Sequence, residues 1–415
     1  MKHRSPCLLS SLLILTFSAS AALTQEMSTL CQFEKGPRAG AIRDYAPMAP
    51  LPVGRPCHDG QGSSGSVVAP MGSSAKISGD VAGFLTSSCA KDAPGGAIIA
   101  VRNGETVLRH ACGLADLEHG IQLEPDMVFR LGSVTKQFTA VAVLMLEREG
   151  KLQVPDEITM HLPDYPTQGK TITVEHLLTH TSGIPNYTAL PGWIEAKAHL
   201  DLSVKEMLAE WQDLPLEFDP GSRFAYSNSG YFMLGAIIEA VSGVDYATFV
   251  EKRIFEPLAM TSSYFGSHSR VIPNRVNGYQ ATDNGDGYLN APFIDMDIPH
   301  AAGSLLSTVD DLAKWDAALY TDQLLPAAAR SRMWTSYILP NSEKAGYGYG
   351  WGIGEVKGRK MVHHGGGIFG FSTMVMRVPE ERLYVAVLTN GGPIDPGAVA
   401  RQTVLALLEE PAESP

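Results

Sequence analysis

The sequence predicts an α+β fold: one antiparallel sheet, built from N- and C-terminal strands and flanked by helices, with an inserted, mostly helical lobe. Strand-like apolar runs occur near residues 96–112 and again near residues 360–388. Residues from 150 to about 300 lie between these runs and have mostly helical and loop-like patterns. Strands from both ends of the chain are most economically buried in one shared sheet, with the helical segment inserted between them as a lobe. We therefore expect a cleft between that sheet and the lobe.

The first two strands are predicted to form a hairpin. Residues 96–101 are apolar, Asn103-Gly104 favours a two-residue turn, and residues 105–112 form the returning strand. A short helix is predicted before them, over residues 77–90. Toward the other end we expect strands over residues 360–364, 372–376 and 383–388 and a closing helix over residues 397–409.

A long amphipathic helix is predicted to begin at Ser133 and to end before Gly150. Its buried stripe has the spacing i, i+3, i+4, i+7, i+8 and consists of Phe138, Val141, Ala142, Met145 and Leu146. Ser133 and Lys136 share one helical face, so the amine can reach the hydroxyl. A hydroxyl beside a buried amine, at the positive end of a helix, is a candidate nucleophile. Ser73 and Ser88 also precede a lysine by three residues, but neither opens such a helix.

A phenol and a carboxamide occur together in Tyr226-Ser227-Asn228, in a polar loop before a helix predicted to begin near Tyr231. A phenol near a buried ammonium can drop in pKa and shuttle a proton. A carboxamide can hold a substrate amide. The same pattern at Tyr288-Leu289-Asn290 lies in a predicted hairpin, so the first copy is the better candidate.

A third motif, His363-His364-Gly365-Gly366-Gly367, lies at the end of a predicted strand. Side chains alternate along a strand, so the two histidines should face opposite ways. We choose His364 as the one facing the cleft, because it directly precedes the glycines. Glycines allow a substrate backbone to approach and leave N–H groups to bind it. His58 also fits the pattern, but it lies in a Pro-, Gly- and Ser-rich segment.

Taken in this order, the three motifs resemble the serine β-lactamase and penicillin-binding-protein superfamily. The chain is most similar to the class C β-lactamase-related branch, with its esterases and D-aminopeptidases. Further segments similar to family signatures are residues 173–184, Pro220-Gly221, residues 303–315, Tyr349-Gly350-Trp351-Gly352 and Leu388-Thr389-Asn390-Gly391. The resemblance covers about residues 78–408.

The resemblance implies a role for each site residue. Ser133 would be the acylated nucleophile and Lys136 its general-base partner. How the lysine and its neighbours share the role of general base is disputed for such enzymes. Tyr226 would shuttle protons to the leaving group and help to activate the deacylating water, and Asn228 would orient the substrate. The backbone N–H groups of Ser133 and Gly367 would form the oxyanion hole.

His364 departs from the family pattern, because many lactamases have the lysine of a Lys-Thr-Gly motif there. A lysine is charged and attracts a substrate carboxylate, whereas a histidine is largely neutral near pH 7. We therefore expect a serine hydrolase that cleaves ester or amide bonds, of the esterase or D-amino-acid peptidase/carboxypeptidase type. The alternatives are a class C-like β-lactamase and a non-catalytic scaffold or ligand-binding member of the fold.

Composition and targeting signals limit the partners and the location. The net charge is −12 and no long basic run occurs, so we expect a small-molecule or peptide substrate and no nucleic acid. Residues 1–21 read as a signal peptide, with Lys2 and Arg4 before an apolar run over residues 8–17. Residues 22–76 read as a flexible extension and residues 77–410 as the hydrolase domain. No later stretch is apolar enough to span a membrane, so we expect export to the periplasm or medium.

Once Cys7 is removed with the signal, the remaining cysteines allow three disulfide connectivities; they are Cys31, Cys57, Cys89 and Cys112. Of these, we favour a Cys31–Cys57 bridge. His176 and His180 have the i, i+4 spacing of zinc ligands, but no glutamate follows His176 as in His-Glu-x-x-His. The run from Asp283 to Gly287 lacks the twelfth ligand of a calcium loop and reads as a turn. We expect no metal and no cofactor.

Overall fold

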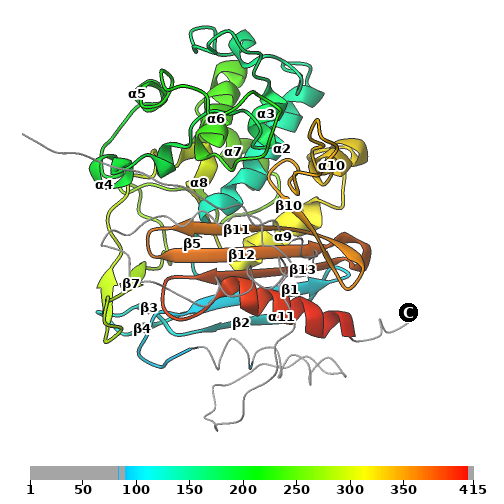
Figure 1. The fold of residues 1–415 in the computed structure, drawn as a ribbon. Coiled ribbons are helices and arrows are strands. Elements are labelled where there is room, and N and C mark those ends of the chain that lie inside the picture. The colour runs from blue at the N-terminus through cyan, green and yellow to red at the C-terminus, as the bar shows by residue number, and fades with distance from the viewer. Residues whose placement is uncertain (1–82, 84–88, 410–415) are drawn as a thin grey trace, which may run out of the picture. The chain divides into compact units, whose positions relative to one another are not determined.

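A six-stranded antiparallel sheet with the order β10-β11-β12-β13-β1-β2 lies under a group of helices (Figure 1). The computed structural model describes residue 83 and residues 89–409, all within the unit Gly40–Pro415. The strands are β1 (Gly96–Arg102), β2 (Glu105–Cys112), β10 (Gly352–Val356), β11 (Arg359–Ile368), β12 (Phe371–Val378) and β13 (Leu383–Thr389). Since β1 pairs with β13 along its whole length, the prediction of one sheet shared by both ends of the chain is confirmed.

The hairpin β1–β2 has the predicted turn. Asn103 and Gly104 both have positive φ, at 54° and 85°, as a two-residue turn of this kind requires. The end of β2 is tied to the segment before β1 by a disulfide between Cys89 and Cys112. The favoured Cys31–Cys57 bridge lies outside the described residues.

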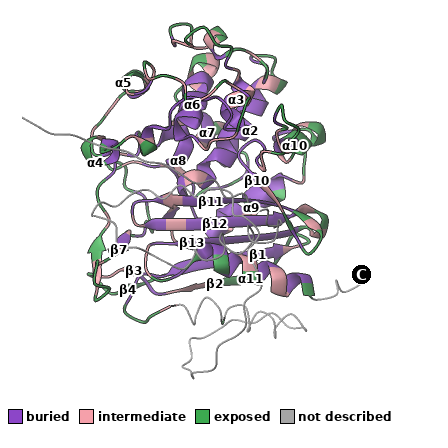
Figure 2. Ribbon diagram, viewed as in Figure 1, coloured by how far each residue is buried: buried purple, intermediate pink, exposed green. Residues whose placement is uncertain are grey.

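The two faces of the sheet pack against different helices. Ile98 and Ala100 point to the face covered by α11 (Pro396–Glu409), which packs on β12 and β13. Ala97 and Ile99 point to the other face, in one apolar cluster with α2 (Thr135–Arg148) and α9 (Val309–Ala318). Because side chains alternate along β1, both faces are buried, as the colouring of Figure 2 shows for the central strands.

The helical lobe is inserted between the first and last strands of the sheet. Its helices are α3 (Val174–Leu178), α4 (Trp193–Lys197), α5 (Val204–Ala209), α6 (Asn228–Ser242), α7 (Tyr246–Val250) and α8 (His300–Gly303), and α10 (Ala327–Met333) follows α9. Short strands accompany them: β3 (Leu114–Asp116), β4 (Ile121–Gln122), β5 (Phe129–Arg130), β6 (Tyr264–Phe265), β7 (Tyr279–Ala281), β8 (Tyr288–Asn290) and β9 (Leu305–Ser307). The predicted α+β architecture is therefore confirmed.

Helix α6 begins at Asn228, earlier than the predicted start near Tyr231. Ser227 is extended and its Oγ accepts the Gly230 N–H at 3.3 Å, which makes Ser227 the N-cap. Asn228 is therefore the first residue of a helix and not part of a loop. At the other end Gly243 has a φ of 78° and closes the helix.

Strand β11 also differs from its prediction, because it does not end at His364. It continues through the three glycines to Ile368 and pairs with β12 from Val362 to Ile368. A Cβ on Gly366 would lie 2.0 Å from the carbonyl oxygen of Leu131. The glycines are thus needed for close contact between this strand and the turn that precedes Ser133.

Several sequence predictions concern residues that the structure does not describe: the signal peptide (1–21), the extension (22–76) and most of the helix over 77–90. Across residue 83 and residues 89–409, no single helix has the length and apolar character to cross a membrane; the bent pair Asn228–Ser242 and Tyr246–Phe255 passes that test only jointly.

Candidate active site

Ser133 lies in a single 3-10 turn, Gly132–Val134, that runs directly into α2. Its side chain is partly exposed, whereas Lys136 is completely buried. Lys136 Nζ lies 3.0 Å from Ser133 Oγ, within hydrogen-bond distance. The i, i+3 spacing therefore places the amine beside the hydroxyl.

The buried amine of Lys136 is also held by two oxygens from the helical lobe. It donates to Asn228 Oδ1 at 2.7 Å and to the carbonyl oxygen of Ala302 at 2.9 Å. The Tyr226 ring lies below it, with its centroid 4.8 Å from Nζ. Two separate parts of the chain, residues 226–228 and Ala302, thus fix the position of one amine.

Asn228 is in turn fixed by the segment that includes Asn186 and Thr188. Its backbone N–H donates to Asn186 Oδ1 at 3.0 Å, and its Nδ2 donates to Thr188 Oγ1 at 3.0 Å. The first hydrogen bond fixes the backbone of Asn228, and the second orients its carboxamide so that Oδ1 faces Lys136. Neither partner was predicted, because each lies some forty residues away along the chain.

The ring of Tyr226 packs against a buried histidine, His180, with ring centroids 4.2 Å apart. His180 Nδ1 accepts the Ser227 N–H at 3.1 Å, and its backbone has a φ of 58°. Burial, with the positive charge of Lys136 nearby, holds the pKa of His180 well below its usual value. A neutral imidazole therefore supports the loop that carries Tyr226.

The Nδ1 atoms of His176 and His180, whose spacing resembles that of zinc ligands, are both hydrogen-bonded within the fold. His176 Nδ1 accepts the Thr173 N–H at 3.2 Å in the capping box of α3. His180 Nδ1 is occupied by Ser227. In the described part of the chain, no group of three potential metal ligands from His, Cys, Asp and Glu occurs.

His364 is buried and hydrogen-bonded at both ring nitrogens. Its Nδ1 contacts the carbonyl oxygen of Gly365, and its Nε2 lies 2.8 Å from the Tyr347 hydroxyl. The pKa of His364 is lowered to about 3, mainly by burial and secondly by the charge of Lys136. Because a carbonyl only accepts, Nδ1 carries the proton of the neutral ring and Nε2 accepts from Tyr347. This position on β11 therefore has no positive charge near neutral pH.

His363 lies beside Gly352 of the edge strand β10, its partner in register. It too is buried, and burial lowers its pKa to about 4. Strand alternation separates it from His364, whose ring contacts Tyr347 and lies near Tyr226, with centroids 6.2 Å apart. The structure thus brings His364 to the residues around Ser133.

Gly132 and Gly367 are in close backbone contact. Gly132 has a φ of 53°, and a Cβ built on it would lie 2.8 Å from the Gly367 nitrogen. The two backbone N–H groups considered for an oxyanion hole, those of Ser133 and Gly367, therefore belong to segments in contact. Glycine is required at 132 both by the positive φ and by this approach.

Besides Asn186 and Thr188, three residues that contact the site were not predicted in that role: Ala302, His180 as a support for Tyr226, and Tyr347 as the partner of His364. The spacing of His180 from His176 pointed only to a metal ligand. Tyr347 lies two residues before the Tyr349-Gly350-Trp351-Gly352 segment. The similarity of that segment to a family signature is the sequence feature that could have drawn attention to Tyr347.

A serine hydroxyl beside a buried lysine amine, at the start of a helix packed on an antiparallel sheet, defines a serine hydrolase of the β-lactamase and transpeptidase type. The chain belongs to the Beta-lactamase family, whose model matches residues 76–409. It is similar to penicillin-binding protein 4* of Bacillus subtilis (strain 168), with 32% identity over 310 residues that cover 71% of this chain and 68% of that protein. Protein flp of Staphylococcus aureus (strain MRSA252) is 27% identical over 304 residues, which cover 72% of this chain and 59% of that protein.

Solved structures have the same fold. The octameric penicillin-binding protein homologue from Pyrococcus abyssi has a TM-score of 0.70 and 32% identity, covering 80% of this chain and 77% of that chain. The D-stereospecific amidohydrolase from Streptomyces sp. has a TM-score of 0.66 and 27% identity, covering 77% of this chain and 96% of that chain.

Proposed function

We propose that the chain hydrolyses ester or amide bonds through an acyl-enzyme on Ser133, as an esterase or a peptidase acting on D-amino acids. The observation that carries this proposal is the 3.0 Å contact between Ser133 Oγ and the buried Lys136 Nζ. A buried amine next to a partly exposed hydroxyl is suited to accept the proton of an attacking serine.

The partners of Lys136 favour its role as the base. To act as a base, Lys136 must first give up the proton that makes it a cation; the neutral amine then has two N–H bonds and one lone pair. The carbonyl oxygen of Ala302 and Oδ1 of Asn228 can only accept, so they take the two N–H bonds. The lone pair then faces Ser133 Oγ, which transfers its proton to Nζ as it attacks the substrate carbonyl carbon.

The later steps use groups around the same serine. The backbone N–H groups of Ser133 and Gly367 stabilise the negative oxygen of the tetrahedral intermediate. Tyr226 passes a proton to the leaving alcohol or amine, and the C–O or C–N bond breaks to leave the acyl-enzyme. Water, deprotonated with the help of Tyr226, then attacks the ester carbonyl, and Ser133 recovers its proton as the acid leaves.

The neutral state of His364 favours substrates that do not depend on a carboxylate. A lysine at this position would present a cation, whereas His364 presents a neutral imidazole held by Tyr347. The likeness to the Streptomyces D-stereospecific amidohydrolase agrees with an amide substrate. A class C-like β-lactamase remains the second candidate, supported by the family model.

The substrate class is tested by comparing wild type with Ser133→Ala on p-nitrophenyl esters, D-alanyl amides and nitrocefin. We expect ester or D-alanyl amide turnover to exceed nitrocefin turnover, and Ser133→Ala to abolish both. His364→Lys should raise nitrocefin turnover relative to ester turnover, whereas His364→Gln should leave the ratio near that of wild type. A large excess of nitrocefin turnover by wild type would contradict the substrate proposal, and inactivity on the whole panel would favour a non-catalytic scaffold.

We further propose that the chain is exported to the periplasm or medium. This rests on the sequence alone, on Lys2, Arg4 and the apolar run over residues 8–17. Amino-terminal sequencing of the mature protein should begin at about residue 22. Recovery of cytoplasmic protein that retains Met1 would contradict it.

A further inference from the structure

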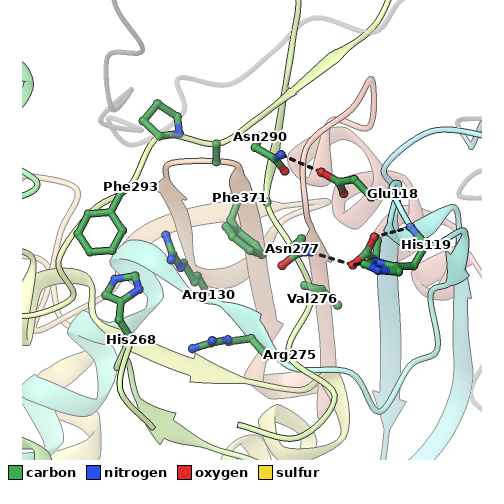
Figure 3. A pocket seen from close by; sticks show the side chains of 14 residues that line it. Glu118, His119, Arg130, His268, Arg275, Val276, Asn277, Asn290, Phe293 and Phe371 are labelled. Carbon is green, nitrogen blue, oxygen red and sulfur yellow. Dashed lines mark hydrogen bonds and ion pairs between the residues drawn. The ribbon is translucent and has the colours of Figure 1, made fainter. Parts of the chain in front are cut away.

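A cavity of about 540 Å³ lies where β5 and the start of β12 meet two loop segments of the lobe (Figure 3). Arg130 lines it from β5 and Phe371 from β12. Figure 3 shows Arg130, Arg275 and His268 along one part of the cavity, with Glu118 and His119 at the other. The groups assigned to hydrolysis do not line it.

The two arginines have no acidic partner in the described part of the chain. Arg130 is half-buried and its guanidinium carbon lies 5.5 Å from the centroid of the Phe371 ring. Arg275 donates from Nη1 to the carbonyl oxygen of Ser267 at 2.7 Å. Most of the other arginines in the described residues form ion pairs, as Arg270 does with Glu251 at 2.8 Å. A pair of uncompensated guanidinium groups is therefore unusual for this protein.

In the described residues, the acidic side chains of the cavity form no ion pair with Arg130 or Arg275, and neutral donors bind them instead. Asp116 Oδ2 accepts from Asn277 Nδ2 at 3.0 Å and also contacts His119. Glu118 accepts from Asn290 and from the Tyr279 hydroxyl, each at 2.8 Å. Within residues 89–409, the basic part of the cavity is thus left with positive charge and no carboxylate against it.

We infer that this cavity binds a small carboxylate that carries an apolar ring. The guanidinium groups of Arg130 and Arg275 can receive the two carboxylate oxygens, since arginine presents a planar fork of N–H donors. Phe371 and the half-exposed Phe293 offer apolar surface for the ring. The site lies beyond the proposed hydrolytic function and does not depend on it.

Two further observations bear on such a ligand: the His268 ring extends the aromatic surface of the cavity, and the two arginines repel each other. His268 Nε2 lies 2.6 Å from the carbonyl oxygen of Ile294, so this nitrogen carries a proton, and its ring packs on Phe293 with centroids 4.2 Å apart. Burial, together with the charge of Arg275, lowers the pKa of Arg130 to about 10. An anion between the arginines would offset the repulsion between them.

The test is calorimetric titration of the full chain with benzoate, and with benzamide as the neutral molecule of the same shape. We expect benzoate to bind and benzamide to bind much more weakly, with benzoate affinity falling as salt rises. Arg275→Gln, a change at an exposed position that should fold normally, should weaken benzoate binding by about tenfold or more, as expected for a lost charged hydrogen bond. Arg130→Gln should have a similar effect.

The matched control is Arg270→Gln, which removes an arginine that already has a carboxylate partner and lies outside the cavity. It should leave benzoate affinity unchanged. The inference is overturned if benzoate does not bind at millimolar concentration. It is equally overturned if benzamide binds as well as benzoate, or if Arg275→Gln binds benzoate as wild type does.

Discussion

Replacing His364 with glutamine should make the protein less sensitive to acid. The pKa of His364 is lowered from its ordinary value of 6.5 to about 3 in the folded state, because the ring is buried and close to Lys136. Between these two pH values the unfolded chain binds a proton that the folded chain does not. The free energy of unfolding therefore falls as the pH drops below about 6.5, and it continues to fall toward about pH 3.

The size of this effect follows from the two pKa values. A pH of about 5 is roughly 1.5 units below the pKa of the histidine in the unfolded chain, and each unit corresponds to about 1.4 kcal/mol of free energy. His364 should thus account for about 2 kcal/mol of the stability lost between about pH 7 and about pH 5. Glutamine does not titrate in this range and can still accept a hydrogen bond from the Tyr347 hydroxyl. The loss of stability between these two pH values should therefore be smaller in His364→Gln than in wild type by this amount.

The assay is urea unfolding at both pH values for wild type, His364→Gln and the control His199→Gln. His199 is exposed, so its replacement removes a histidine without disturbing a buried contact. His180 and His363 remain in every variant, so His364→Gln should still lose stability in acid, but by less than wild type. An identical loss in wild type and His364→Gln would refute a neutral, buried His364.

Three further predictions concern Lys136, Gly132 and the disulfide. Lys136→Met should lower kcat/KM for an ester substrate by roughly a hundredfold to ten-thousandfold, the range for loss of a general base, with an unchanged circular dichroism spectrum; near-normal turnover would exclude that role. Gly132→Ala should destabilise the protein more than Gly120→Ala, because both have positive φ but only the Cβ at 132 meets the opposing strand; equal melting temperatures would contradict this. Reduction of Cys89–Cys112, with a sequence separation of 23, should lower the free energy of unfolding by about 3 kcal/mol, and an unchanged denaturation midpoint would speak against it.

Local sequence patterns predicted the features that depend on neighbours along the chain. The hairpin at Asn103-Gly104 follows from turn chemistry, and the contact between Ser133 and Lys136 follows from helical spacing. In both cases the interacting groups are within four residues of each other, so no knowledge of tertiary structure was needed.

Long-range contacts could not be predicted in this way. Lys136 and Ala302 are 166 residues apart, and the support of Tyr226 by His180 depends on how two loops of the lobe pack. The choice of His364 over His363 rested on its place directly before the glycines, but the neutral state of the ring is fixed by burial and by Tyr347. The sequence pattern predicted that β11 ends at His364, although the strand continues to Ile368. Glycines weaken a strand pattern even where close backbone contact requires them.

The most direct test of the central proposal is intact mass spectrometry after incubation with a fluorophosphonate or a labelled penicillin. We predict one covalent adduct on wild type, its loss in Ser133→Ala, and its retention in Ser73→Ala and Ser88→Ala, the other serines that precede a lysine by three residues. An adduct that persists in Ser133→Ala, or wild type left unlabelled by both reagents at high concentration, would contradict Ser133 as the nucleophile.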